Sequence, residues 1–356
     1  MATFGALIRS YRQHAGLGLR TFASLIDQRA STCSAIECGD RAPWRRGVAL
    51  QRIADVLGID TASNLWEKIL KLAKENPQPP SNSLTAARLV WWWQTDEAPN
   101  LATTELLDLA NFAGALGDLE PFKQTDDKVT PLTELAIEWR ARRLLGRRET
   151  SSAAASVDVE AALENEAGVQ IKIVPGLIPR FSVQACVILT SDGLTLLVDR
   201  IVADSRPMAS YRQLLAHMYA PVALWKADRC WTAQWFLAQQ SDGSWKQRQR
   251  DCERFALATL LPANAVLTGA EAAYTEIVGQ QGWIEVDEAV RMLRNRLAEQ
   301  FAVPTSLIHR RLVGWPCHLY GRVAQALAAQ EPTLPPLDWL AEESAPRQQL
   351  LFDLAK

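Results

Sequence analysis

The chain has 356 residues, of which 48% are hydrophobic and 22% are charged, and its formal net charge is −2. This length exceeds what one hydrophobic core usually serves, so we expect two domains and a connecting region. The near-neutral balance excludes a polycation that binds nucleic acid along its whole length. The sequence contains no apolar run long enough to span a membrane, and its amino terminus lacks the pattern of a signal peptide. We therefore expect a cytoplasmic protein without a membrane partner.

Positive charge is concentrated near the amino terminus. Residues 4–58 contain eight arginines against four acidic residues, which leaves a local balance of +4. A basic segment in a slightly acidic chain indicates an acidic partner. The six cysteines contain no C-x-x-C pair, which argues against a zinc ribbon or a redox dithiol, and we expect them to be reduced and mostly buried. They are Cys33, Cys38, Cys186, Cys230, Cys252 and Cys317.

The first predicted elements with a clear pattern are two short helices in residues 19–38. Their apolar residues recur at helical intervals and are separated by a three-residue turn, which is helix-turn-helix spacing. A closing helix is predicted in ALQRIADVLGI, 49–59, with Gly58 as its stop. The predicted inner faces consist of Leu19, Phe22, Ala23 and Ile26 in the first helix, Ala30, Cys33 and Ile36 in the second, and Leu50, Ile53, Ala54 and Leu57 in the third.

These residues resemble the XRE-family, lambda-repressor-like DNA-binding domain, over about residues 4–66. The pattern L-R-x-x-A followed by S-x-I-E-x-G-x-x-x-P is matched by Leu19, Arg20, Ala23, Ser34, Ile36, Glu37, Gly39 and Pro43. At the turn, Asp27 and Gln28 replace the glycine and the small apolar residue that are usual in the family. The resemblance implies an all-α helix-turn-helix domain, which we place at residues 1–76, and double-stranded DNA as its partner.

The resemblance also implies where DNA would be contacted. A recognition helix that starts near Arg29 would present its first exposed side chains to base edges in the major groove, while other arginines would contact phosphates. The predicted base contacts are Arg29, Ser31, Thr32 and Ala35, and the predicted phosphate contacts are Arg20, Arg41, Arg45 and Arg46. Arg29 has the alternative of a solvated turn charge, and Ser31 and Thr32 that of local capping. Glu37 is expected to be a structural hydrogen-bonding residue.

After a proline-rich boundary at 75–83, residues 84–148 carry apolar residues at helical intervals. We predict helices in LTAARLVWWW (84–93), ATTELLDLANFAGAL (102–116) and PLTELAIEWRARRLL (131–145), with residues 77–130 as a helical connector. Three adjacent tryptophans, 91–93, cannot all lie on one helical face, so one must contact another segment or a second subunit. A homodimer is our hypothesis, since helix-turn-helix proteins commonly bind paired half-sites. Packing between the protein's own domains is the alternative.

The remaining chain mixes strands and helices. VQACVILTSDGLTLLVDR, 183–200, predicts a hairpin with its turn at Asp192-Gly193, and helices are predicted at 210–224, 250–261 and 287–301. Five pieces in order resemble the ImmA/IrrE family of zinc metallopeptidase-like domains over about residues 131–320: EWRARRLL, the hairpin, RQLLAHMYAPVAL, ERFALATLLPANAV and LAEQFAVPTSLIHRRL. The resemblance implies a zincin-like mixed α+β domain with a carboxyl-terminal tail at 131–356, and an α+β class for the whole chain.

In that family the central helix carries H-E-x-x-H, in which two histidines bind zinc and the glutamate polarises the metal-bound water. The corresponding stretch here is His217-Met218-Tyr219-Ala220-Pro221, so the base and the second ligand are absent. Proline would also disturb the helix. The expected third ligand aligns with Gln249, with Asp251 and Glu253 nearby. One histidine and one carboxylate fall short of the three protein ligands of a catalytic zinc site.

We therefore expect no metal, no cofactor and no catalytic residue, and a degenerate-site pocket formed by His217, Met218, Pro221, Gln249 and Glu253. The functional hypothesis is a sequence-specific DNA-binding transcriptional regulator, a repressor, whose inactive peptidase-like domain binds a small-molecule, peptide or protein effector at the pseudo-active site. Two alternatives stay open. One is an antitoxin-type interaction protein that represses its own operon, and the other is a residual zinc metallopeptidase.

Overall fold

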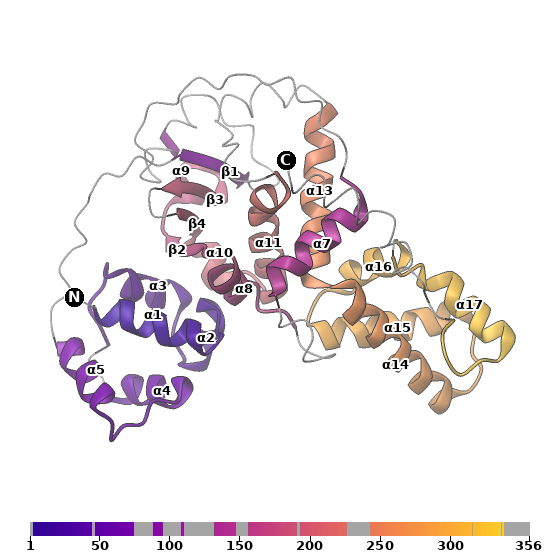
Figure 1. The fold of residues 1–356 in the computed structure, drawn as a ribbon, viewed down its shortest axis with the longest axis horizontal. Helices are drawn as coiled ribbons and strands as arrows, with labels where there is room; N and C mark the ends of the chain where they lie inside the picture. Colours follow the sequence, from indigo (N-terminus) through magenta and orange to yellow (C-terminus); the bar gives the residue numbers. More distant parts are fainter. Residues whose placement is uncertain are drawn as a thin grey trace, which may run out of the picture. The chain divides into compact units, whose positions relative to one another are not determined.

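The structure is a computed structural model that describes residues 3–44, 47–74, 88–94, 108–109, 132–146, 156–190, 193–225, 243–314, 316–335 and 337. The chain is α+β, with many helices and one four-stranded sheet among these residues (Figure 1). It forms two compact units, Met1–Pro131 with Asp158–Cys252, and Leu132–Val157 with Glu253–Lys356. These units do not follow the expected boundaries at 76 and 130, because the first unit also takes in residues 158–252.

The first unit begins with five helices, α1 (Phe4–His14), α2 (Leu19–Leu25), α3 (Ala30–Cys38), α4 (Gly47–Leu57) and α5 (Asn64–Lys74). Helices α2 and α3 confirm the predicted pair, and every predicted inner-face residue of the two is buried. Leu50, Ile53 and Ala54 of the closing helix are also buried. Gly39 ends α3 with a φ of 82°, a left-handed conformation that glycine adopts without steric cost.

The turn between α2 and α3 depends on one non-glycine residue in a left-handed conformation. Asp27, at the position where the resemblance has glycine, has a φ of 56°. Aspartate tolerates this region better than most residues, because its short polar side chain can bond locally. The departure from glycine therefore leaves a tight turn between α2 and α3 in place. Arg52 of α4 donates to the Asp27 carboxylate at 2.9 Å on the surface.

The sheet of the first unit has the order β1-β3-β4-β2. Strands β3 and β4 pair antiparallel with Thr190 opposite Gly193, which confirms the predicted hairpin, although its turn residues 191–192 lie outside the described residues. Strand β2 pairs parallel to β4 and forms one edge of the sheet. The elements of this part are α8 (Val159–Glu166), β2 (Gln170–Val174), α9 (Leu177–Phe181), β3 (Val183–Thr190), β4 (Gly193–Asp199), α10 (Arg200–Ser205) and α11 (Met208–Trp225).

The prediction of a helix in LTAARLVWWW is wrong. Residues Arg88–Gln94 form strand β1, which pairs antiparallel with β3 and places Trp92 opposite Cys186. Aromatic and β-branched residues favour strands, and pairing with an apolar neighbour strand outweighs the helical spacing of the sequence. Trp91–Trp93 therefore do not share a helical face, and the reason for expecting a dimer contact there is removed. The predicted helix at 102–116 lies almost wholly outside the described residues.

Helix α11 confirms the helix predicted at 210–224 and corrects the expectation that Pro221 disrupts it. The helix continues through Pro221 to Trp225. Proline removes only one backbone donor, the one that would bond the carbonyl of His217, and the buried packing of α11 holds the remaining turns. α11 packs against α8, β1 and β3.

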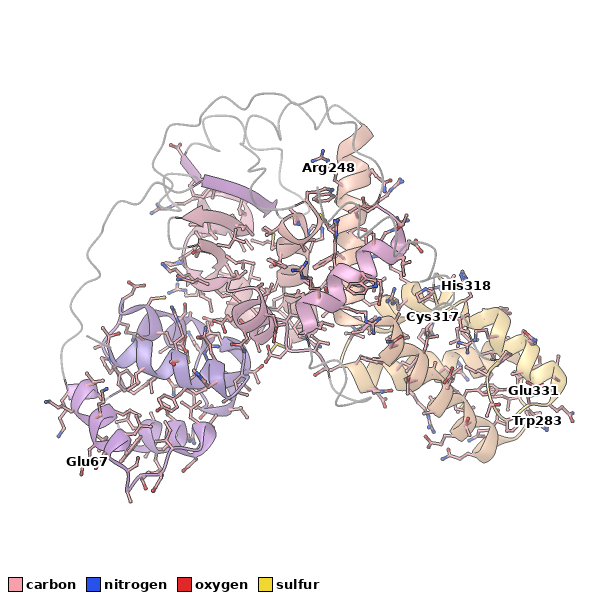
Figure 2. All side chains as sticks on the ribbon, viewed as in Figure 1. Glu67, Arg248, Trp283, Cys317, His318 and Glu331 are labelled. Atoms are coloured by element: carbon pink, nitrogen blue, oxygen red, sulfur yellow. The ribbon has the colours of Figure 1, made fainter. Side chains whose placement is uncertain are left out.

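The second unit consists of helices among its described residues: α7 (Glu134–Leu145), the second half of α13 (Gly243–Leu260), α14 (Ala263–Gln281), α15 (Val286–Phe301), α16 (Thr305–Val313) and α17 (Leu319–Ala329). The helices predicted at 131–145, 250–261 and 287–301 are confirmed. Helix α15 packs against α14, α16 and α17, and their side chains fill the space between them (Figure 2).

No single described helix is long and apolar enough to cross a membrane, and one pair bent by 54°, Gln247–Leu260 with Ala263–Gln281, passes that test only when its two helices are taken together. The five described cysteines are free, and all but the half-buried Cys38 are buried, which confirms the expectation for these five.

The strain at Asp27 can be measured with two substitutions that both remove the contact with Arg52. Asp27→Gly should be more stable than Asp27→Ala by about 1 kcal/mol, because alanine has the higher cost in a left-handed conformation. Chemical denaturation of the two full-length variants measures this difference. Equal stabilities would show that residue 27 does not adopt a positive φ.

Candidate nucleic-acid interface

The exposed part of the predicted DNA-reading face lies at the start of α3. Arg29 is the N-cap residue of α3 and is exposed, as is Arg41 beyond its end. The guanidinium of Arg41 donates to the Thr32 hydroxyl at 3.3 Å, and its backbone N–H donates to the carbonyl of Ala35 at 3.1 Å. The structure therefore brings Thr32, Ala35 and Arg41 together on one side of α3. Arg45 and Arg46 lie outside the described residues.

A neighbouring side of α3, which includes Ser31, is covered by the same chain. α3 packs against β2 and α10 (Figure 1). Asp204 of α10 accepts from the Ser31 backbone N–H at 3.2 Å and from the Ser31 hydroxyl at 2.7 Å. The backbone N–H of Ile173, on the edge strand β2, donates to the Ser34 hydroxyl at 3.0 Å. Ser31, a predicted base contact, is therefore bonded within the protein.

The amino-terminal end of α2 is also held by carboxylates from elsewhere in the chain. Gly18 is the N-cap residue and has no side chain with which to cap the helix. Asp158 accepts from the Gly18 N–H at 3.0 Å and from the Thr21 hydroxyl at 2.7 Å, and Glu160 accepts from the Arg20 N–H at 2.6 Å. A Cβ atom at Gly18 would lie 2.3 Å from the Asp158 carboxylate, so only glycine permits this approach.

Arg20 does not lie where the resemblance places it. Its guanidinium donates to the backbone carbonyl of Arg206 and stacks 4.8 Å from the ring centroid of Tyr211. Tyr211 in turn donates from its hydroxyl to Glu160 at 2.6 Å. Arg20 is thus part of an internal contact rather than a free phosphate ligand in this arrangement. The sequence gives no sign that α11 supplies an aromatic surface for Arg20, so this contact was not expected.

The most deeply buried polar group in this contact is Arg12 of α1, whose side chain is 0% exposed. Its guanidinium donates twice to Glu37, twice to Glu164 of α8 and once to the carbonyl of Leu17, at 2.5 to 2.9 Å. All five guanidinium donors are therefore satisfied. Arg9 adds a 3.2 Å bond to Glu37, which gives the cluster two positive and two negative charges. Glu37 is confirmed as a structural hydrogen-bonding residue.

Burial sets the electrostatics of the two α8 glutamates. Burial, and then the charge of Asp158, raises the pKa of Glu160 to about 8, against the opposing hydrogen bonds from Tyr211 and the Arg20 N–H. Burial also raises the pKa of Glu164, and the hydrogen bonds from Arg12 oppose that rise. Glu160 is thus held close to its point of ionisation at neutral pH.

Sequence reasoning missed four acidic residues that accept hydrogen bonds from the helix-turn-helix segment, α1–α3 (residues 4–38). They are Asp158, Glu160, Glu164 and Asp204. The stretch DVEAALENE, 158–166, does contain three of them, with Glu160 and Glu164 one helical turn apart. Acidic residues on a short helix usually face solvent. The opposite charges of these acids and of the basic segment at 4–58 could have indicated a contact between the two stretches. They could not have identified which residues pair.

The degenerate-site residues lie on two helices, His217, Met218 and Pro221 on α11 and Gln249 and Glu253 on α13. His217 and Met218 are buried in α11, and burial lowers the pKa of His217 to about 4. Gln249 belongs to the first unit, whereas Glu253 belongs to the second and accepts from Arg310 at 3.3 Å. Among the described residues no group of three or more His, Cys, Asp or Glu side chains is arranged to hold a metal ion.

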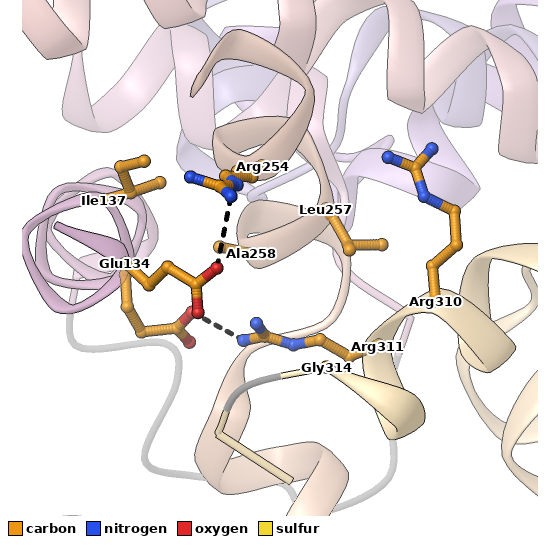
Figure 3. A pocket seen from close by; sticks show the side chains of 9 residues that line it. Glu134, Ile137, Arg254, Leu257, Ala258, Arg310, Arg311 and Gly314 are labelled. Atoms are coloured by element: carbon orange, nitrogen blue, oxygen red, sulfur yellow. Dashed lines mark hydrogen bonds and ion pairs between the residues drawn. The ribbon is translucent and has the colours of Figure 1, made fainter. Parts of the chain in front are cut away.

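A pocket of about 170 Å³ lies in the second unit, between α7, α13 and α16 (Figure 3). None of the five degenerate-site residues lines it. Three arginines border it, and each is paired with a carboxylate, Arg254 with Glu134 at 3.4 Å, Arg310 with Glu253 at 3.3 Å and Arg311 with Glu138 at 2.5 Å. Since its cations are already paired, the pocket's charges give no preference for one ligand class.

Glu138 and Arg311, which form a buried ion pair, are among the residues that line this pocket. Glu138 also accepts from the backbone N–H of Ala263, the first residue of α14, at 2.7 Å, and Arg311 donates to the carbonyl of Leu261 at 2.9 Å. The pair thus joins α7 and α16 to the connection between α13 and α14. Glu138 and Arg311 therefore have a structural role in the second unit.

Comparisons with protein-family models, with curated proteins and with solved structures found no match to the chain.

The raised pKa of Glu160 predicts a pH dependence of stability. In the folded state Glu160 keeps its proton up to about pH 8, whereas the ordinary pKa of a glutamate is 4.5. Between these two pH values the folded state therefore binds more protons than the unfolded state. The free energy of unfolding should therefore fall as the pH rises from about 4.5 to about 8, and Glu160→Gln should lack this part of the fall. Denaturation of both proteins across this range measures the difference, and parallel curves would contradict it. The ionisable groups around Glu160 are Asp158, Glu164, Tyr211 and Arg20.

The guanidinium of Arg12 is shared by Glu37 and Glu164, and the contribution of Glu164 can be measured. Glu164→Gln should lower the free energy of unfolding by about 2 kcal/mol, because Arg12 loses a charged acceptor in a site without water contact. Glu166→Gln, a change of an exposed glutamate on the same helix, is the matched control and should have almost no effect. Chemical denaturation followed by circular dichroism measures both. A loss in Glu164→Gln no larger than that in the control would mean that Arg12 does not depend on α8.

Proposed function

We propose that the protein is a sequence-specific DNA-binding transcriptional regulator that acts as a repressor. The observation that carries the proposal is the α2–turn–α3 arrangement, with a left-handed turn at Asp27 and with Arg29, Thr32 and Arg41 accessible at the second helix. In helix-turn-helix proteins the amino-terminal residues of the second helix reach base edges in the major groove. Arginine and threonine side chains supply donors and acceptors for such contacts.

Charge supports the same proposal. The +4 balance of residues 4–58 favours a polyanionic partner, and Arg29 and Arg41 are exposed on the predicted reading face. We further propose that the regulator is a homodimer in the cytoplasm, since paired half-sites are the usual targets of this motif. The carboxyl-terminal residues would form a metallopeptidase-like domain without catalytic activity that binds an effector. By the resemblance, Met218 and Pro221 align with the base and the second metal ligand that such activity needs.

DNA selection with the purified chain tests the proposal. A duplex selected from a randomised library should bind tightly, with an affinity that falls steeply as salt is raised, since arginines displace counterions from phosphates. Arg29→Ala with Thr32→Ala should weaken binding to the selected duplex about tenfold or more and leave weak binding to unrelated duplexes. Fluorescence anisotropy at several salt concentrations measures both.

Arg291→Ala is the control for the loss of an exposed arginine, because its side chain is 61% exposed and lies in the second unit. It should bind the selected duplex as the wild type does. If the Arg29 and Thr32 double variant keeps full affinity and selectivity, the reading face is misassigned. If no duplex is enriched, the proposed function is wrong.

A further inference from the structure

One part of the proposed reading face is occupied by the protein itself. Asp204 binds both the backbone N–H and the hydroxyl of Ser31, in the first turn of α3, and α10 packs directly against this helix. Ser34, one turn further along, accepts from Ile173 on the sheet edge. The first turn of a recognition helix is the part that must approach base edges most closely.

The dimensions of DNA leave little space beside a helix that lies in the major groove. A helix with its side chains is about 10–12 Å in diameter, and the major groove is about 12 Å wide, so the groove admits one helix. In the structure α10 and β2 both lie against α3. Asp204 of α10 occupies the Ser31 hydroxyl and backbone N–H, so a base edge or phosphate cannot bind these groups while α10 is in place.

Charge acts in the same direction. Asp158, Glu160, Glu164 and Asp204 all face the basic helix-turn-helix segment and accept hydrogen bonds from it. DNA carries about one negative charge per 1.7 Å of its axis, so phosphates in this region would be repelled by the carboxylates of Asp158 and Asp204, whereas Glu160 keeps its proton up to about pH 8. The acidic groups thus satisfy donors of the segment while excluding its proposed ligand.

We infer that the α8–β2–α10 face is an autoinhibitory surface, which docks on the helix-turn-helix segment and competes with DNA for it. The inference rests on the proposed DNA-binding function and adds a regulatory step to it. The protein exchanges between a docked arrangement, as in the structure, and a released one that binds DNA. The apparent affinity for DNA is then the intrinsic affinity reduced by the released fraction.

The nature of the contact makes release physically feasible. The apolar residues that hold α1, α2 and α3 together, such as Phe22 and Ile26, form the segment's own core. The bonds between Asp204 and Ser31 and between Asp158 and Thr21 are only partly buried, so water can replace them. Release must also separate Arg12 from Glu164, and water would then solvate both of these charged groups. The segment can therefore separate from the surface without losing its core.

Two substitutions open the contact by different means. Asp204→Ala removes the acceptor of both Ser31 bonds. Gly18→Ala places a methyl group 2.3 Å from the Asp158 carboxylate and 2.6 Å from the Glu160 Cβ, so the docked surface must shift, whereas the backbone of Gly18, with φ −67° and ψ 158°, accepts alanine without strain. The double variant combines them.

The matched control is Glu166→Ala with Gly279→Ala. It also removes one negative charge and adds one methyl group, but Glu166 is exposed on α8, and a Cβ at Gly279 would meet no atom within 4 Å among the described residues. The control therefore accounts for the general effect of charge on DNA affinity. Glu67, an exposed acid on α5 (Figure 2), is a second position for such a control.

Two measurements are made on full-length protein. Binding to a mixed-sequence duplex of about 30 base pairs at about 50 mM salt is followed by fluorescence anisotropy. Hydrogen exchange of the Ile173 amide, which donates to Ser34, reports docking, and exchange of the Ile26 amide, which donates to Phe22 within the helix-turn-helix segment, reports that this segment is folded.

In the opened variant, Asp204→Ala with Gly18→Ala, the Ile173 amide should exchange faster while the Ile26 amide stays protected. This variant should bind the duplex about tenfold more tightly than the control. Unchanged exchange at Ile173 would show that these contacts do not hold the docked state, and faster exchange without tighter binding would show that docking does not compete with DNA. Either result overturns the inference and leaves DNA binding in place. If neither the wild type nor the opened variant binds duplex, although Ile173 is freed, the proposed function itself fails.

Discussion

The arrangement of the first unit depends on one buried cation. Arg12 lies on α1, and its five donors are divided between Glu37 of the helix-turn-helix segment, Glu164 of α8 and the Leu17 carbonyl. A charge without water contact requires such complete pairing, because an unpaired guanidinium in a protein interior costs several kcal/mol. The carboxylate that completes the pairing is 152 residues away in the chain. One side chain therefore joins the core of the helix-turn-helix segment to the mixed α+β part, and the two form one compact unit.

The other contacts follow from this anchor. With α8 fixed beside α1, Asp158 and Glu160 reach the start of α2, where Gly18 leaves space for them, and α3 comes to lie along the open edge of the sheet. An edge strand carries unpaired backbone donors, and native proteins usually cover such an edge. Here the cover is the helix proposed to read DNA. The same surface would protect the sheet in the docked state and bind an operator in the released state, so folding and proposed function act on the same residues with opposite requirements.

The sequence predicted the local elements of the helix-turn-helix segment well, because spacing alone determines which side chains of a short helix face inward. Leu19, Phe22 and Cys33 are buried as their spacing predicts. It failed where pairing at long range decides. Residues 88–94 have helical spacing but form a strand beside β3, and Arg20 lies on Tyr211 rather than free in solvent. Ser31 was correctly placed in the first turn of α3, but its partner Asp204 is 173 residues away, and no local pattern identifies such a partner.

In the proposed regulation, DNA and the α8–β2–α10 surface exclude one another on the segment that contains α2 and α3. A distance across the contact tests it most directly. Spin labels at Glu67 on α5 and at Glu166 on α8, both exposed, would be measured by pulsed electron spin resonance with and without saturating duplex. We expect a narrow distance distribution in the free protein and a shifted, broader one when DNA is bound. A distribution that stays the same while DNA is bound would contradict it.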